Sequence, residues 1–83
     1  MSWYLYIVRC SDGSYYTGIT TDLARRIKMH NTKVGAKSLY GRLPVVLSYF
    51  EKYADKIQAA KREREIKGWR RNKKEKLVSK GLP

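Results

Sequence analysis

Apolar and aromatic residues dominate the start of the chain, from Trp3 to Cys10, without a helical period. This composition is typical of a β-strand, and the Asp-Gly pair in the turn at 11–14 favours a hairpin. The return strand is therefore predicted at Tyr15 to Ile19. A further strand is predicted at Val45 to Phe50, because β-branched and aromatic residues follow a proline there. Several orders of these strands in a sheet remain open.

The tyrosines of the predicted hairpin fall on two faces of the sheet. Successive side chains of a strand alternate, so Tyr4 and Tyr6 share one face. Tyr15 and Tyr16 point to opposite faces, and only one of them can join Tyr4 and Tyr6. Aromatic residues at strand or helix spacing usually pack, so we expect four of them in the core in preference to a stacking role: Tyr15, Tyr40, Tyr49 and Trp69.

The first helix is predicted directly after the hairpin, from Asp22 to about Asn31, where apolar residues recur four positions apart. Thr20 or Thr21 is expected to cap it, with Asp22 in the first turn, where a negative charge suits the helix dipole. The segment 32–44 carries glycines and charges but no steady period, so it is predicted as a loop.

Two more helices are predicted after the last strand. Asp55 and Gln58 have the spacing of a capping box, and the helix that they begin is expected to run to Lys67, before Gly68. A short final helix is expected to follow the cap Asn72 and to end at the next glycine. The pattern thus predicts a small α+β fold in the order β-β-α-β-α-α.

The charge balance points to a class of partner. The chain has 19 Lys and Arg residues against 7 Asp and Glu residues, a formal net charge of +12. Such an excess favours a polyanionic partner, of which nucleic acid is the commonest. An anionic membrane surface and a merely solvated basic surface are the alternatives from charge alone.

Length and composition limit the architecture. With 83 residues the chain has material for one core, so a single domain covering 1–83 is expected. No apolar run approaches the roughly 20 residues that cross a bilayer, and the N-terminus lacks the layout of a signal peptide. We therefore expect a cytoplasmic protein with no membrane partner.

Few catalytic chemistries fit the available side chains. One cysteine, Cys10, and one histidine, His30, cannot build a zinc cluster, and there is no Gly-rich phosphate loop. Arg26 and His30 lie four residues apart, so they share a helix face just after the tyrosines. Helical spacing places Glu63 on the side of its helix that should meet the sheet, where an unpaired carboxylate is costly. A salt bridge, a metal ion and a role as catalytic base all remain open for Glu63.

Together these side chains are suited to phosphodiester hydrolysis. A divalent cation on Glu63 would polarise the phosphate, and Arg26 would neutralise charge on its oxygens. A tyrosine would orient or deprotonate the attacking water, which requires lowering its ordinary pKa of about 10. His30 would relay the proton or hold a phosphate.

Two tripeptides and the helix after them resemble a known family. Tyr4-Leu5-Tyr6, Tyr16-Thr17-Gly18 and the segment from Asp22 to His30 are similar to motifs of the GIY-YIG nuclease superfamily. Later segments resemble its small bacterial stand-alone branch: Gly35 to Arg42, Pro44-Val45 and Glu63 to Lys67. The resemblance implies a three-stranded antiparallel sheet flanked by helices. It also implies cleavage of DNA that depends on a divalent metal, Mg²⁺ or Mn²⁺.

The same resemblance implies roles residue by residue. Its catalytic positions fall on Tyr6, Tyr16, Arg26, His30 and Glu63, with Glu63 as the single metal-binding carboxylate. One of the two tyrosines would act as general base, and which one stays open. Phosphate contacts are expected from a set of basic residues: Arg25, Lys28, Lys37, Arg42 and Lys67.

The chain departs from the family pattern within the motifs. Tyr4 replaces the glycine of the first motif and Thr17 the isoleucine of the second, and both substitutions are tolerable in strands. Ile19 stands where the excision-repair nucleases carry a lysine that helps to lower the tyrosine pKa. The late asparagine of other branches has no clear counterpart, because Asn72 already has a capping explanation.

Two functional hypotheses follow. The first is a metal-dependent endonuclease acting on DNA, such as damaged, branched or single-stranded forms, with RNA left open. The second is a non-catalytic nucleic-acid-binding module that retains the nuclease fold. Convergence of the catalytic positions around one open cavity favours the enzyme. A Glu63 held in a buried salt bridge remote from Tyr16 disfavours it.

Overall fold

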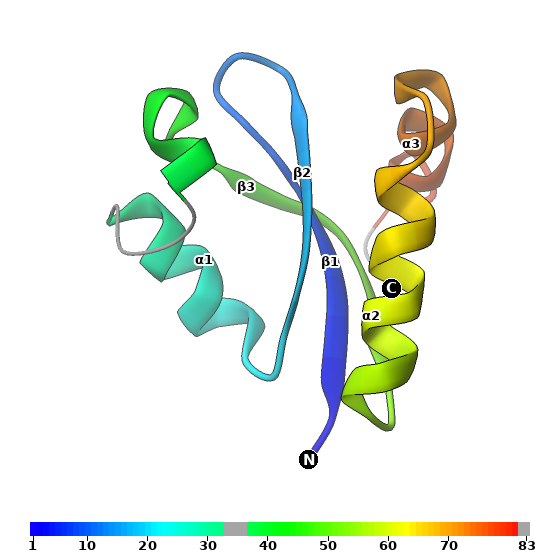
Figure 1. The fold of residues 1–83 in the computed structure, drawn as a ribbon. Helices are drawn as coiled ribbons and strands as arrows, with labels where there is room; N and C mark the ends of the chain where they lie inside the picture. Colours follow the sequence, from blue (N-terminus) through cyan, green and yellow to red (C-terminus); the bar gives the residue numbers. More distant parts are fainter. Residues whose placement is uncertain (33–36, 82–83) are drawn as a thin grey trace.

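The predicted hairpin forms the centre and one edge of a sheet. The computed structural model describes residues 1–32 and 37–81. Strand β1 (Trp3–Arg9) pairs antiparallel with β2 (Tyr15–Thr20) on one side and with β3 (Val46–Tyr53) on the other. The order β2-β1-β3 answers what the sequence left open, and Figure 1 shows the twisted sheet between two groups of helices. The third strand runs beyond its predicted end at Phe50.

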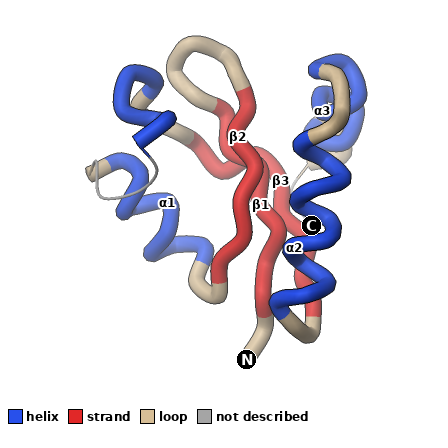
Figure 2. The backbone as a smooth tube through the Cα atoms, in the orientation of Figure 1, coloured by secondary structure: helices blue, strands red, loops and turns tan. Residues whose placement is uncertain are grey.

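Helices cover both faces of the sheet, as Figure 2 shows in blue against the red strands. Helices α1 (Leu23–Asn31) and η1 (Lys37–Arg42) lie on one side, and α2 (Lys56–Lys67) and α3 (Arg71–Val78) on the other. The α+β class and the order β-β-α-β-α-α are confirmed. The predicted loop at 32–44 is wrong in one part, because η1 is a 3-10 helix. In the described ranges, no helix has the length and apolar character needed to cross a membrane.

The helix caps follow the predictions only in part. Asp22 itself caps α1 by accepting a backbone hydrogen bond at 3.1 Å, so the predicted caps Thr20 and Thr21 are wrong. The Thr20 hydroxyl instead accepts a hydrogen bond from the Asp22 backbone N–H at 3.2 Å. Asp55 caps α2 as predicted. Asn72 lies inside the first turn of α3 and does not cap it, because that helix starts one residue earlier.

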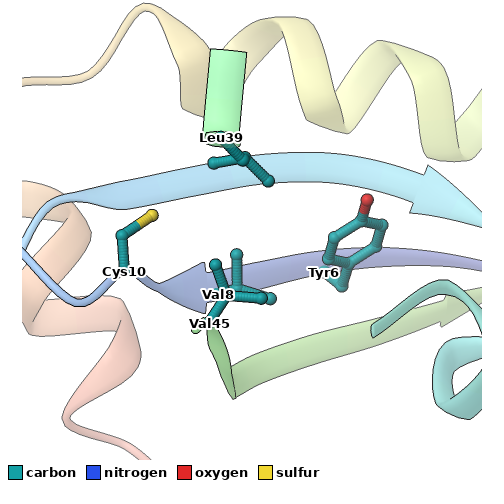
Figure 3. Packing of buried hydrophobic residues seen from close by; sticks show 5 residues of the cluster. All are labelled: Tyr6, Val8, Cys10, Leu39 and Val45. Carbon is teal, nitrogen blue, oxygen red and sulfur yellow. The ribbon is translucent and has the colours of Figure 1, made fainter. Parts of the chain in front are cut away.

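Each face of the sheet has a core of its own. The buried hydrophobic cluster of the α1 side consists of Tyr6, Val8, Cys10, Leu39 and Val45, and Figure 3 shows these side chains gathered around β1. Those of the α2 side are Leu5, Ile7, Ile66 and Leu77. Alternation along β1 therefore supplies both cores from one central strand.

Cross-strand pairing assigns the hairpin tyrosines to faces. Tyr6 lies opposite Gly18, and Val8 lies opposite Tyr16. Residues directly opposite each other in an antiparallel pair share a face, so Tyr16 joins Tyr6 on the α1 side. Tyr15 packs against the core of the α2 side.

The expectation that the remaining aromatic residues pack holds for most of them. Partly buried side chains against the α2-side core include Tyr15, Tyr49 and Trp69. Tyr40 is 43% exposed, so its predicted place in the core is wrong. The reason is that η1 turns the neighbouring Leu39 inward, where it is fully buried.

Candidate active site

The centre of the candidate site is the Tyr6 side chain, which β1 directs towards α1. Tyr6 is 1% exposed, and its hydroxyl oxygen lies 2.8 Å from Nε2 of His30, which is equally buried. The Tyr6 ring passes close over Gly18 of β2, where a Cβ atom would lie 2.5 Å from the Tyr6 hydroxyl oxygen. The glycine of the second motif is thus needed so that the tyrosine of the first can reach α1.

Burial sets the charge state of this pair. It raises the pKa of Tyr6, although the Arg26 guanidinium beside the phenol acts in the opposite direction. Burial and the same guanidinium lower the pKa of His30. Both groups are therefore neutral at pH 7, and Tyr6 takes part as a hydrogen-bonding phenol and not as a phenolate.

Tyr16 lies against this pair from the neighbouring strand. Its ring meets the His30 ring edge-on with centroids 5.5 Å apart, and its centroid lies 6.5 Å from that of Tyr6. Tyr16 is only partly buried, whereas Tyr6 and His30 are fully enclosed. Because β2 is an edge strand, Tyr16 stands at the border of the sheet.

Helix α2 brings Glu63 to the same border from the opposite face. Lys67 Nζ lies 3.3 Å from a Glu63 carboxylate oxygen and 5.8 Å from the centroid of the Tyr16 ring. The Glu63 side chain is 21% exposed and that of Lys67 is 51% exposed. Besides the larger effect of burial, the Glu63 carboxylate contributes to the raised pKa of Tyr6. Glu63 therefore has the salt bridge that one prediction named, but the pair is open to solvent and lies beside Tyr16.

Arg26 provides an unpaired donor next to the tyrosines. Its Nε is buried and has no hydrogen-bond partner within the described part of the chain. A cavity of about 260 Å³ lies at this end of α1, lined by Thr20, Thr21, Asp22, Arg25, Arg26 and Met29. A buried donor without an acceptor is costly and calls for an explanation such as a ligand. Since guanidinium groups pair well with phosphate, Arg26 is suited to a phosphate oxygen.

Glu63 is the candidate metal ligand. Among residues 1–32 and 37–81, no group of three or more His, Cys, Asp or Glu side chains is arranged to hold a metal ion. A single carboxylate still fits Mg²⁺, which keeps several waters and is often bound through one or two carboxylates and substrate phosphates. Lys67, at 3.3 Å, would have to release the carboxylate.

The basic residues predicted to contact phosphates are spread over the molecule. Arg25 lines the cavity at the start of α1, and Lys28 and Lys37 are exposed. Arg42 donates a hydrogen bond to Ser14 Oγ at 3.0 Å and so links η1 to the hairpin turn. The contact of Arg42 supports the fold, whereas Arg25 lines the same cavity as Arg26 and Lys67 lies beside Tyr16 and Glu63.

The sequence prediction missed a second polar cluster, on the α2 side. Glu51 of β3 accepts hydrogen bonds from the hydroxyls of Tyr49 and Tyr53 at 2.6 Å each, and from Arg62 of α2 at 2.9 and 3.2 Å. Burial opposes ionisation of Glu51, but these donors outweigh it and hold its pKa below the ordinary value. Burial and the Glu51 carboxylate raise the pKa of both tyrosines to about 12. The alternation Tyr-x-Glu-x-Tyr on one strand face is the signal available in the sequence.

The chain matches one family over nearly its whole length. Residues 2–76 match the family described as the GIY-YIG catalytic domain. A UPF0213 protein of Haloquadratum walsbyi is 50% identical over 78 residues, which cover 94% of this chain and 88% of that relative. A UPF0213 protein of Staphylococcus saprophyticus is 51% identical over 78 residues, covering 94% of this chain and 95% of that relative.

Two solved structures share the fold. The solution NMR structure of a UPF0213 protein from Bacillus halodurans matches with a TM-score of 0.61 at 48% identity, covering 95% of this chain and 84% of that chain. The solution NMR structure of a protein from E. faecalis matches with a TM-score of 0.64 at 38% identity, covering 96% and 85%. The sheet and helices described above are therefore shared with experimentally determined relatives.

Proposed function

This chain belongs to the family of GIY-YIG catalytic domains, and from that membership we propose that it is a nuclease, acting as a divalent-metal-dependent endonuclease on DNA phosphodiester bonds. The observation that carries the proposal is the unpaired, buried Nε of Arg26 beside the Tyr6 and His30 pair. A folded protein rarely leaves such a donor without an acceptor. Its position next to the tyrosines supports a phosphate oxygen as the missing acceptor.

Arg26 would bind and neutralise the phosphate that is cleaved. Negative charge grows on the phosphate oxygens as water attacks, and a positioned guanidinium stabilises that charge. The hydrogen-bonded Tyr6 and His30 pair adds no charge, since both groups are neutral. The pair would instead keep the Arg26 side of the site rigid and dry.

Tyr16 is the tyrosine that we assign to the attacking water. Tyr6 is unsuited to this task, since its hydroxyl is bound to His30 at 2.8 Å and burial raises its pKa. Tyr16 is partly exposed on the edge strand and has the Lys67 ammonium beside its ring. It would orient the water on the open side of the phosphate.

Glu63 would hold the divalent ion, together with water and phosphate oxygens. The bound ion would supply polarisation of the phosphate and stabilisation of the leaving oxygen. Lys67 would then lose its partner carboxylate and become available to a neighbouring phosphate. This exchange makes Lys67 a phosphate contact, as the sequence predicts.

Glu63→Gln tests the proposal. In Mg²⁺ or Mn²⁺, we expect nicking of duplex, branched and single-stranded DNA to fall about 100-fold or more, because an amide is a poor replacement for a metal-binding carboxylate. Glu65→Gln is the matched control, because Glu65 is an exposed acid on the same helix. Both variants should unfold at similar temperatures. Equal cleavage by the two variants would contradict the proposed role of Glu63.

A second candidate function is a nucleic-acid-binding module without catalysis. The ion pair between Lys67 and Glu63 favours it, because a carboxylate that is already neutralised has less need of a metal. This function predicts DNA binding that weakens steeply with salt. It also predicts no cleavage in any divalent metal and unchanged binding by Glu63→Gln.

A further inference from the structure

A basic hollow lies on the other flank of α2, away from the candidate active site. Its volume is about 300 Å³, and it is lined by Arg62, Trp69, Lys73, Lys76, Leu77 and Lys80. We call it the Trp69 hollow. Four of its lining residues are cations and none is acidic. None of them belongs to the catalytic or phosphate-contact positions that the sequence predicts.

The two flanks of α2 face opposite edges of the sheet. Lys67 lies beside Tyr16 on β2, whereas Arg62 binds Glu51 on β3 at 2.9 Å. Strands β2 and β3 are the two edges of the order β2-β1-β3. The Trp69 hollow is therefore a separate surface, and a strand bound there would not occupy the site at Tyr16.

Trp69 gives the hollow an aromatic wall that is held in place. The side chain is partly buried and packs against the α2-side core. Arg62 lies 5.1 Å from the ring centroid, and its guanidinium is tied to Glu51 by hydrogen bonds of 2.9 and 3.2 Å. A ring fixed in this way is a preformed stacking surface.

The lysines of the Trp69 hollow form no ion pairs with acidic side chains in the described ranges. Lys73, Lys76 and Lys80 are exposed, and none has an ion-pair partner in the described ranges. Lys73 Nζ lies 4.3 Å from the Trp69 ring centroid, held by a cation–π contact of modest strength at an exposed position. Lys73 can therefore leave the ring for a stronger anion, and its departure uncovers the aromatic surface.

We propose that the Trp69 hollow binds a nucleic-acid strand, with an unpaired base stacked on Trp69 and the flanking phosphates on Lys73, Lys76 and Lys80. A cationic groove with an aromatic platform is the combination that binds unpaired strands with little sequence preference. The choice of nucleic acid over another polyanion rests on the proposed function. The hollow would hold the strand outside the cut site and so add affinity without chemistry.

Fluorescence of Trp69 tests the proposal directly. Trp3→Phe leaves Trp69 as the only tryptophan, and Glu63→Gln in the same protein prevents cleavage during the titration. Oligothymidylate should quench the Trp69 emission. An abasic oligonucleotide of the same length should leave the emission unchanged and bind about 5-fold or more weakly, because the stacked base is missing.

Two charge-neutralising double variants distinguish binding in the Trp69 hollow from general electrostatic attraction to the basic protein. Lys73→Gln/Lys76→Gln should weaken oligothymidylate binding about 10-fold and lower the salt dependence by the equivalent of about two phosphates. Lys52→Gln/Lys56→Gln changes the net charge equally on β3 and at the other end of α2, and should bind within about 2-fold of the parent.

Several results would overturn the inference. Equal binding by the two double variants would show that the hollow is not the site. Quenching by polyglutamate or by anionic vesicles as strong as that by oligothymidylate would point to an acidic peptide or a membrane. The proposed function fails separately: in that case the protein with native Glu63 does not cleave DNA in Mg²⁺ or Mn²⁺, while oligothymidylate still quenches Trp69.

Discussion

The two faces of the sheet carry similar polar groups in different states. On the α2 face, Glu51 is bound by Arg62 and by two tyrosine hydroxyls, so donors and acceptor satisfy one another. On the α1 face, Tyr6 and His30 bind each other, but Arg26 keeps a buried Nε without a partner in the described part of the chain. Each face thus joins tyrosines to an arginine, but in the Glu51 cluster these groups have partners, whereas Arg26 has one buried N–H without a partner in the described part of the chain.

This difference separates a stabilising cluster from a binding site. A complete buried network rigidifies the fold, whereas an incomplete one costs stability unless a ligand completes it. We therefore expect mutations in the Glu51 cluster to change the free energy of unfolding. Replacing Arg26 itself should change activity with little effect on unfolding.

Exchanging the two arginines for alanine should give the largest and clearest contrast. Arg26→Ala is expected to lose about 100- to 1000-fold in cleavage rate, because a charge-stabilising donor disappears. Arg62→Ala is expected to keep its cleavage rate at saturating DNA but lose about 2 kcal/mol in the free energy of unfolding, because Glu51 loses its charged partner. Cleavage assays and urea unfolding of both variants measure the two effects.

Two results would contradict the predicted difference between the Arg26 and Arg62 variants. If folded Arg62→Ala protein loses cleavage as strongly as Arg26→Ala, the Glu51 cluster also serves catalysis. If Arg26→Ala unfolds as easily as Arg62→Ala, the Arg26 guanidinium is a structural element. Either result would remove the distinction between the two faces.

Gly18→Ala should damage the α1 face alone. An added Cβ would lie 2.5 Å from the Tyr6 hydroxyl oxygen and 2.7 Å from the ring carbon that bears it, so the ring must shift. We expect a loss of about 1–3 kcal/mol in the free energy of unfolding and weaker cleavage. Gly41→Ala is the matched control, because a Cβ at Gly41 meets no atom within 4 Å. Thermal unfolding of the two variants measures the difference, and equal stability would show that Tyr6 adapts freely.

Features with local causes could be predicted from the sequence. Alternation along the strands restricts Tyr15 and Tyr16 to opposite faces, and the cap Asp55 and the stop at Gly68 set the ends of α2. The predicted caps that failed are Thr20, Thr21 and Asn72. Asp22 caps α1 in place of the threonines, and Arg70 occupies the cap position of α3, two residues before Asn72. Local competition of this kind is decided by small energies.

Contacts between distant segments could not be predicted in the same way. The approach of Tyr6 to Gly18 depends on strand register, and the bond of Arg62 to Glu51 depends on how α2 docks on the sheet. Arg26, His30 and Glu63 could be named from their types and helical spacing, whereas Tyr6 and Tyr16 were singled out by the resemblance to the family. The roles of all five residues stay predictions. The sequence offered no means to see that Nε of Arg26 is buried without a partner in the described part of the chain, since that requires the positions of all its neighbours.

Acid should weaken the two faces in separate pH ranges, the smallest of the expected effects. His30 is the only histidine of the chain, and its pKa is lowered below 6.5 by burial and by Arg26. As the pH falls, His30 is therefore protonated at a higher pH in the unfolded chain than in the folded chain. The free energy of unfolding decreases as the pH falls below about 6.5. The pKa of Glu51 is held below 4.5, so its contribution is present above that pH and is lost only in stronger acid.

Variants of His30 and Glu51 should each affect the loss of stability in one of the two pH ranges. Urea unfolding between pH 7 and pH 3 should show a slope of at most about 1.4 kcal/mol per pH unit for each proton. His30→Asn should flatten the curve between pH 7 and 5 and leave the fall below pH 4.5. Glu51→Gln should reduce the fall below pH 4.5 and leave the fall between pH 7 and 5. If the free energy of unfolding of His30→Asn still falls between pH 7 and 5, some other group titrates in that range. The buried neutral histidine would then not explain the acid sensitivity of the α1 face.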